Sequence, residues 1–258
     1  MNLKRVIQGF LVGVGKIIPG VSGSMLAMFM GIYEPLMEAV TRFFDDKKKH
    51  FNLLFYFGIG LFLAIVLFSK IILFLLENYY DVTIYLFLGL ITGTVFQFKK
   101  QVVFNRKNKI IFLFAFFVLS IFPFFNAGGT FVFQNSIFHY LYLILLGGID
   151  AFTSIVPGIS GTAIFMMLGS YEFVLSVLAN PFSVLFLFYL VGLILGVIFT
   201  CYLMYYLFQK WKNETHVVIL AFSLSSLLML FLNVCSSISF FLILIFVIGM
   251  VIGYLFDR

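Results

Sequence analysis

The chain has 258 residues, of which 63% are hydrophobic, 20% are aromatic and only 10% are charged. About a quarter of the residues of a soluble domain are charged, so this composition excludes a soluble enzyme and also a disordered chain. The net charge of +6 comes from basic residues in short runs between apolar stretches, a pattern typical of membrane topology rather than of nucleic-acid binding. We therefore predict an all-α polytopic membrane protein with a single membrane domain over residues 1–258.

The apolar stretches come in two kinds, continuous and interrupted. In chain order they are an interrupted stretch at 3–40, continuous stretches at 51–76, 82–98 and 109–125, a second interrupted stretch at 137–179, and continuous stretches at 183–208, 216–233 and 238–256. Each continuous stretch is long enough to cross a bilayer, which takes about 17 to 20 residues. The interruptions read PGVSG and PGISG, and such sequences end one helix and cap the next. Each interrupted stretch is therefore expected to be two half-helices forming a re-entrant hairpin or a broken helix buried in protein.

The basic residues distinguish between these topologies. If both interrupted stretches enter and leave on one side, 14 of the 16 Lys and Arg residues share a face with the two termini and the loops 41–50, 99–109 and 209–215. Only Lys16 and Lys70 lie inside apolar segments. If the interrupted stretches crossed the bilayer, this asymmetry would be lost. The positive-inside rule therefore predicts six transmembrane helices, two re-entrant hairpins and both termini in the cytoplasm, although 137–156 is long enough to span alone.

The two interruptions are copies of each other at an offset of 138 residues. PGVSGSMLAMFMGIYE begins at Pro19 and PGISGTAIFMMLGSYE begins at Pro157, and eight of their 16 positions are identical. Three predicted crossings follow each copy, and because this number is odd, the second half should be inserted upside down. We predict an inverted structural repeat, with repeat 1 at about 1–125, repeat 2 at about 137–256 and hairpin tips that meet near the midplane, as in secondary transporters. The alternative is a duplication kept only for packing.

The hairpin tips carry the groups that bind anions. The N-terminus of a half-helix exposes unpaired N–H groups and the positive end of its dipole, and hydroxyl side chains add donors. Glycines let a ligand approach the backbone closely. The predicted site for a phosphate or carboxylate group consists of Ser22, Gly23, Ser24, Ser160, Gly161, Thr162 and Lys16, with tip backbone from Pro19, Gly20, Pro157 and Gly158.

Four ionisable residues lie in or beside the hairpins. Lys16 is three residues before Pro19, and it would pair with the anion or be neutralised by Asp150 or by carbonyls at the break. Glu34 and Glu172 each follow a tip hydroxyl by ten residues, about 15 Å of helix, which places one near each membrane interface. With Asp150, they are candidates for proton coupling. The alternative is that the two glutamates are interface carboxylates hydrogen-bonded to the neighbouring hairpin.

Two further patterns in the sequence limit the possible functions of the protein. No nucleotide-binding G-x-x-x-x-G-K-[ST] sequence is present, so we expect a transporter that does not hydrolyse ATP, and the three separated histidines suggest no metal or cofactor. Gly9 and Gly13, and likewise Gly192 and Gly196, have the small-xxx-small spacing of packed helices, so we expect helix packing rather than substrate contact.

The duplicated PGVSGS…GIYE and PGISGT…GSYE motifs resemble the bacterial polyprenyl-phosphate (undecaprenyl phosphate) transporters, over essentially the whole chain. The resemblance implies return of undecaprenyl phosphate from the outer to the cytoplasmic leaflet of the bacterial cytoplasmic membrane, for cell-wall polymer synthesis. It also implies protons as the coupling ion, with the motif positions from Pro19 to Glu34 and from Pro157 to Glu172 as functional residues. Family members commonly carry an acidic residue in place of Lys16 and a glycine in place of Ser24.

Two other functions fit the same residues. An ion-coupled secondary transporter of a small soluble anion would have a closed aqueous cavity, whereas a lipid carrier would have a lateral opening lined by Phe and Leu. A membrane phosphatase acting on lipid phosphates would need Arg, Lys and His together around the phosphate, and the sequence shows no such set.

Overall fold

The computed structural model describes residues 3–17, 23–121, 134–159, 161, 164–165, 168–178, 180, 182–234 and 239–255, and all regular elements in these ranges are helices. The first half contains α1 (Leu3–Ile17), α2 (Gly23–Phe29), α3 (Tyr33–Thr41), α4 (Lys47–Asn78), α5 (Tyr80–Phe98), the 3-10 helix η1 (Lys99–Gln101) and α6 (Arg106–Ile121). The second half contains α7 (Ile137–Ile155), α9 (Tyr171–Leu178), α10 (Val184–Lys210), α11 (Lys212–Val234) and α12 (Phe240–Leu255). The predicted all-α class is confirmed.

Each continuous apolar stretch corresponds to one helix, namely α4, α5, α6, α10, α11 and α12, while residues 122–125, 238 and 256 lie outside the described ranges. Among the described residues, Tyr80–Gln101, Ile137–Ile155 and Val184–Lys210 are long and apolar enough to cross a membrane, and Phe240–Leu255 is a shorter apolar helix. The second of these is α7, which we predicted as the incoming arm of a hairpin. Its length also allows the alternative of a full crossing.

The outgoing arms of both interrupted stretches differ from the prediction of one continuous half-helix. The chain turns sharply at Gly31 and at Gly169, both with φ of 63°. After each glycine, an amide donates to the carbonyl five residues back, from Ile32 to Ala27 at 3.0 Å and from Ser170 to Phe165 at 2.9 Å. This is a Schellman helix end, which glycine adopts at least cost because it lacks a Cβ. The prediction of a single outgoing arm was therefore wrong, because α2 and α3 are separate helices and the same turn precedes α9.

Helix pairs pack in matching ways in the two halves. Helix α1 packs on α4 as α7 packs on α10, and α5 packs on α12 as α11 packs on α6. A Cβ on Gly9 would lie 2.0 Å from the Phe57 carbonyl oxygen, and one on Gly192 would lie 1.9 Å from that of Ile144. These helices therefore approach so closely that only glycine fits, which confirms the predicted packing role of the small-residue spacings.

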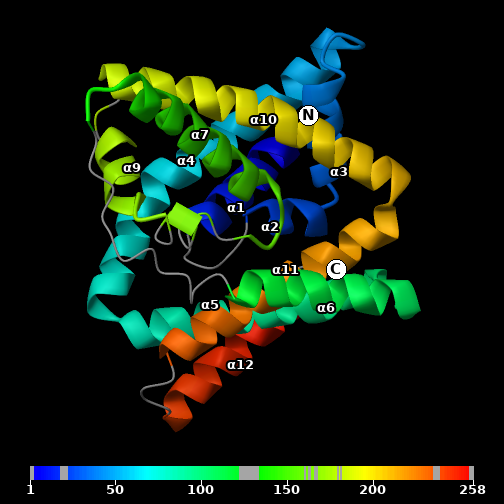
Figure 1. Ribbon diagram of the computed structural model, residues 1–258. Coiled ribbons are helices and arrows are strands. Elements are labelled where there is room, and N and C mark those ends of the chain that lie inside the picture. Colours follow the sequence, from blue (N-terminus) through cyan, green and yellow to red (C-terminus); the bar gives the residue numbers. More distant parts are fainter. Residues whose placement is uncertain are drawn as a thin grey trace.

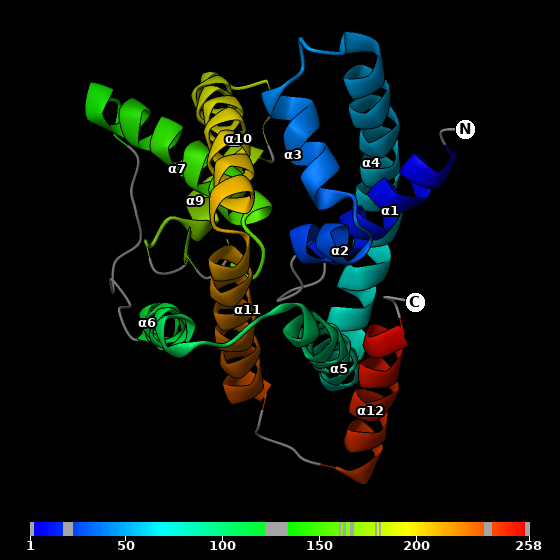
Figure 2. The same cartoon turned by 90° about the vertical axis from the view of Figure 1, so that its right-hand side faces the viewer.

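In Figure 1, helices α1 and α2 lie between the pair α7 and α10 at one edge and the group α5, α11 and α12 at the other. Figure 2 shows α2 near the middle of the molecule, whereas the N-terminal end of α1 reaches one side. Residues of α2, such as Met25 and Ala27, are almost completely buried. In contrast, α10 and α12 expose rows of large apolar side chains, including Leu195, Phe199 and Ile248. The break of the first interrupted stretch thus begins a buried helix, surrounded by helices whose outer faces suit lipid.

Several loops that we predicted to share one face are in direct contact. Lys107 Nζ lies 2.9 Å from Glu214 Oε1, and Asn213 Oδ1 accepts from the Val103 amide at 2.9 Å. Lys212 Nζ lies 2.7 Å from Glu34 Oε1, while Lys100 Nζ donates to the Tyr254 hydroxyl at 2.9 Å. The loop before α6, the turn from α10 to α11, the start of α3 and the end of α12 are therefore neighbours. We call this group of loops the basic face.

Candidate functional site

The structure describes only part of the predicted tip. Gly23, Ser24, Pro157, Gly158 and Gly161 lie within the described residues. The remaining predicted tip residues lie outside them, and these are Pro19, Gly20, Ser22, Ser160 and Thr162, together with the side chain of Glu172. The described part of the site consists of the elements on either side of each break.

The helices on either side of the first break pack against each other. Gly23 is the first residue of α2, and a Cβ placed on it would lie 2.8 Å from the Val12 carbonyl oxygen and 3.4 Å from Lys16 Cβ. The start of α2 therefore packs against the last turns of α1. Lys16 lies in the last turn of α1, beside the break, with an exposed side chain and no ion pair to another described residue.

The second break packs against α11. Helix α7 ends at Ile155, and Gly158 follows with φ of 84°, a backbone conformation that favours glycine. A Cβ on Gly158 would lie 2.7 Å from Ser223 Oγ, and Ser226 Oγ donates to the Gly158 carbonyl at 2.7 Å. The Pro157-Gly158 turn is thus held on a serine-bearing surface of α11.

Ser223 also contacts α2, the helix that follows the first break. Ser223 Oγ lies 3.3 Å from Met25 Sδ on α2, and Ser223 is buried. The Tyr33 hydroxyl donates to the Ile155 carbonyl at 2.9 Å, so α3 is tied to the end of α7. Two segments 138 residues apart in the sequence are therefore brought together at the middle of α11. We call this region the paired-break site.

The serines of α11 were not among the residues predicted from the sequence. Ser223 and Ser226, together with Ser225, interrupt an apolar stretch that we treated as a simple crossing. Serines inside an apolar segment were the available signal, since buried hydroxyls need partners and often lie against another backbone.

Asp150 has neutral partners. The Tyr189 hydroxyl donates to Asp150 Oδ2 at 2.5 Å, and Ser154 Oγ lies 3.4 Å from Oδ1. Tyr189 is fully buried on α10, and no sequence pattern predicts its pairing with Asp150. Asp150 forms no ion pair with Lys16 or with any other described cation. Among the residues that the structure describes, the partners of the half-buried Asp150 carboxylate are therefore hydroxyl groups.

Glu34 lies on the basic face. It is exposed, and it forms the ion pair with Lys212 described above. The location of Glu34 near a membrane interface stays a prediction. Within the described ranges, no three His, Cys, Asp or Glu side chains gather in a way that could hold a metal ion.

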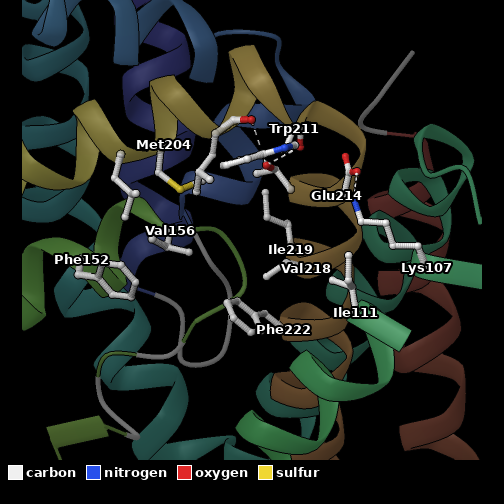
Figure 3. A pocket seen from close by; sticks show the side chains of 13 residues that line it. Lys107, Ile111, Phe152, Val156, Met204, Trp211, Glu214, Val218, Ile219 and Phe222 are labelled. Atoms are coloured by element: carbon white, nitrogen blue, oxygen red, sulfur yellow. Dashed lines mark hydrogen bonds and ion pairs between the residues drawn. The ribbon is translucent and has the colours of Figure 1, made fainter. Parts of the chain in front are cut away.

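A cavity of about 440 Å³ opens between α6, α7, α10 and α11 (Figure 3). Its lining residues are Lys107, Ile111, Phe152, Val156, Leu203, Met204, Leu207, Trp211, Glu214, Thr215, Val218, Ile219 and Phe222. Apolar side chains form its body, whereas the Lys107–Glu214 ion pair lies at one end (Figure 3). Val156 caps α7 directly before the Pro157-Gly158 turn, so the other end borders the paired-break site. We call this cavity the apolar pocket.

Comparison with known proteins assigns the family. The family model described as undecaprenyl phosphate translocase-like matches residues 12–232. The chain belongs to this family. It is 25% identical over 235 residues to a polyprenyl-phosphate transporter of Vibrio cholerae, covering 83% of this chain and 72% of that protein. It is 24% identical over 272 residues to a polyprenyl-phosphate transporter of Staphylococcus aureus, covering 98% of this chain and 95% of that one. No solved structure matches the chain.

These comparisons confirm the family resemblance. The match includes the paired-break site and every residue that lines the apolar pocket, because all of them lie within residues 12–232. With the long apolar helices described above, they indicate a membrane protein of a transporter family.

Proposed function

We propose that the protein is an undecaprenyl phosphate translocase of the bacterial cytoplasmic membrane. It returns the lipid carrier from the outer to the cytoplasmic leaflet for cell-wall polymer synthesis and hydrolyses no ATP. The main observation behind the proposal is that Ser223 of α11 lies beside both Met25, which follows the first break, and Gly158, which is part of the second. The family assignment and the names of the two relatives support the choice of lipid.

The physical task of such a protein is to carry a phosphate across hydrocarbon. A phosphomonoester carries about −1.5 to −2 charges at neutral pH, and an unpaired ion in an apolar medium costs many kcal/mol. The isoprenoid tail can stay in the bilayer beside the protein, so only the headgroup needs donors. Their proposed sources are the tip hydroxyls of Ser22, Ser24, Ser160 and Thr162, the glycine amides beside them, and Lys16.

Alternating exposure of this site follows from an inverted repeat. The matched helix pairs and the two matched glycine turns support a common ancestry of the halves. The odd number of predicted crossings after each break supports opposite orientations in the membrane. The contacts of the basic face support placing 99–109 and 209–215 on one side, which we propose is cytoplasmic, with both termini. In this scheme, the halves rock about the paired-break site and expose it to one leaflet at a time.

Proton coupling is assigned to carboxylates in or beside the hairpins. Asp150, Glu34 and Glu172 remain the candidates, and of the two whose side chains the structure describes, the surroundings favour Asp150. Glu34 is exposed and paired with Lys212, whereas Asp150 is half-buried and has only hydroxyl partners among the described residues. Protonation of Asp150 would remove the negative charge that α7 carries near the paired-break site. The loss of this charge would bias the direction of the rocking motion.

The test is exchange of undecaprenyl phosphate between leaflets in liposomes that contain the purified protein, with and without an imposed proton gradient. We expect gradient-sensitive exchange in the wild type and loss of the gradient response in Asp150→Asn. The matched variants Glu34→Gln and Glu172→Gln show whether either of the other carboxylates is also needed.

Three outcomes would oppose parts of the proposal. An unchanged gradient response in all three neutral variants would overturn the proton assignment. No exchange by folded protein that takes up a soluble anion would favour the small-anion transporter. Release of inorganic phosphate from a polyprenyl diphosphate would favour the phosphatase.

A further inference from the structure

We propose that the apolar pocket is a second lipid site, at which the transported lipid is held before release. The isoprene units nearest the headgroup would lie between α6, α7, α10 and α11, with the phosphate beside Lys107 on the basic face. This inference rests on the proposed function and deepens it by naming a release site separate from the paired-break site.

The body of the pocket suits a branched hydrocarbon chain. Phe152, Leu203 and Phe222 line it with apolar side chains from three different helices (Figure 3). Its volume of about 440 Å³ lies within the range of about 300–1,000 Å³ usual for ligand pockets. A long isoprenoid would place only its first units here, and the remainder would leave into the bilayer. A small soluble anion would gain nothing from such walls, because its charge would be desolvated without compensation.

The mouth of the pocket suits a phosphate. The Lys107 side chain is 66% exposed and forms its ion pair with Glu214 at the surface, where such pairs are weak. A phosphate carries more negative charge than a carboxylate and has more acceptor oxygens, so it can replace Glu214 as the partner of Lys107. Trp211 lies at the same end, and its partly exposed indole is of the kind found at membrane interfaces. An apolar body with a basic mouth is complementary to an anionic lipid.

The pocket also adjoins the paired-break site. Val156 and Ile219 both line it, and the Ile219 carbonyl oxygen would lie 3.1 Å from a Cβ on Gly158. The inner end of the pocket is therefore a neighbour of the second break, while the outer end is Lys107. A lipid that leaves the paired-break site can keep its first isoprene units against protein while its phosphate moves to the basic face.

Photolabelling tests this site directly. The probe is a polyprenyl phosphate with a diazirine on the isoprene unit next to the phosphate, added to the full-length protein in nanodiscs. We expect mass spectrometry to find labels on residues lining the pocket, such as Phe152, Leu203 and Phe222. Excess undecaprenyl phosphate should abolish this labelling, whereas inorganic phosphate and phosphatidylglycerol should not.

Two pairs of variants sharpen the test. Leu203→Trp fills the pocket and should reduce labelling about tenfold, while Leu195→Trp, on the exposed face of the same helix, should not. Lys107→Gln should weaken competition by undecaprenyl phosphate about tenfold, the effect expected for one charge-assisted hydrogen bond. Lys109→Gln is its control, because Lys109 is exposed on α6 but does not line the pocket.

The outcomes separate the two proposals. Labels confined to the outer faces of α10 or α12, or labelling of Leu203→Trp equal to the wild type, would overturn the release site while leaving the translocase intact if leaflet exchange persists. Equal competition by phosphatidylglycerol would indicate a general lipid groove and would also overturn it. A wild type that neither exchanges undecaprenyl phosphate nor is labelled would contradict both proposals.

Discussion

At the scale of single residues, the carboxylates differ in the kind of partner they have. Glu214 accepts a hydrogen bond from Lys107, and this bond, with a backbone hydrogen bond, lowers the pKa of the Glu214 carboxyl below its usual value. Because the folded-state pKa is the lower one, the pair's contribution to stability is present above the unfolded pKa and is lost as the pH falls through the folded one. The pair is at the surface, so we expect this contribution to be small.

This arrangement predicts the titration of Glu214. Lys107→Gln removes the main cause of the lowered pKa, so the Glu214 pKa should rise towards its ordinary value. Carboxyl ¹³C NMR of labelled protein in nanodiscs measures it, with Lys109→Gln as the control. An identical Glu214 titration curve in Lys107→Gln and wild-type protein would show that Lys107 is not its partner.

The residues that were predictable from the sequence are those in the repeated motif. Gly23, Pro157 and Gly158 lie where the duplicated pattern placed them, beside the breaks. Tyr189 and Ser223 were not predictable, because each acquires its role from a partner on a distant helix. A buried tyrosine or serine in an apolar stretch shows that a partner is needed but not which one.

At the scale of helices, close approach through glycine determines how the pairs pack. A Cβ on Gly60 of α4 would lie 1.9 Å from the Val6 carbonyl oxygen on α1, whereas a Cβ on Gly58 would have no atom within 4 Å. These two glycines lie two residues apart in one helix and face different surroundings. They therefore form a matched pair for testing how α1 and α4 are held together.

We predict opposite effects of alanine at these positions. Gly60→Ala should force α1 and α4 apart and destabilise the protein by about 1–3 kcal/mol, the range usual for overpacking. Gly58→Ala should be neutral or stabilising by up to about 1 kcal/mol, because alanine favours the helix. Thermal unfolding in detergent measures both. Equal stability of the two variants would contradict the close packing of α1 on α4.

The helices themselves were largely predictable, and the turns within the hairpins were not. The six continuous apolar stretches each became one helix because their length and composition allow little else in a membrane. Gly31 and Gly169 appeared in the sequence as identities of the repeat, and a single glycine inside a helix is tolerated. The left-handed turn at each position depends on the packing of the helix that follows, which no local pattern specifies.

At the scale of the whole molecule, the two halves meet around α11. Helix α2, after the first break, contributes Met25, the second break contributes Gly158, and Ser223 lies beside both. The duplication predicted that the two breaks should be equivalent, and the fold brings their surroundings together. The apolar pocket was not predictable, since its walls come from four helices in both halves. Only the general expectation of an apolar opening for a lipid came from the sequence.

The central claim is that both breaks form one phosphate site. The most direct measurement is leaflet exchange of undecaprenyl phosphate by Ser22→Ala, Ser160→Ala and the double variant, in liposomes with equal amounts of folded protein. If one phosphate contacts both tips, each single variant should slow exchange by about tenfold, as expected for the loss of a hydrogen bond to a charged group. The double variant should abolish the gradient-sensitive exchange. Wild-type exchange by the double variant would contradict the account.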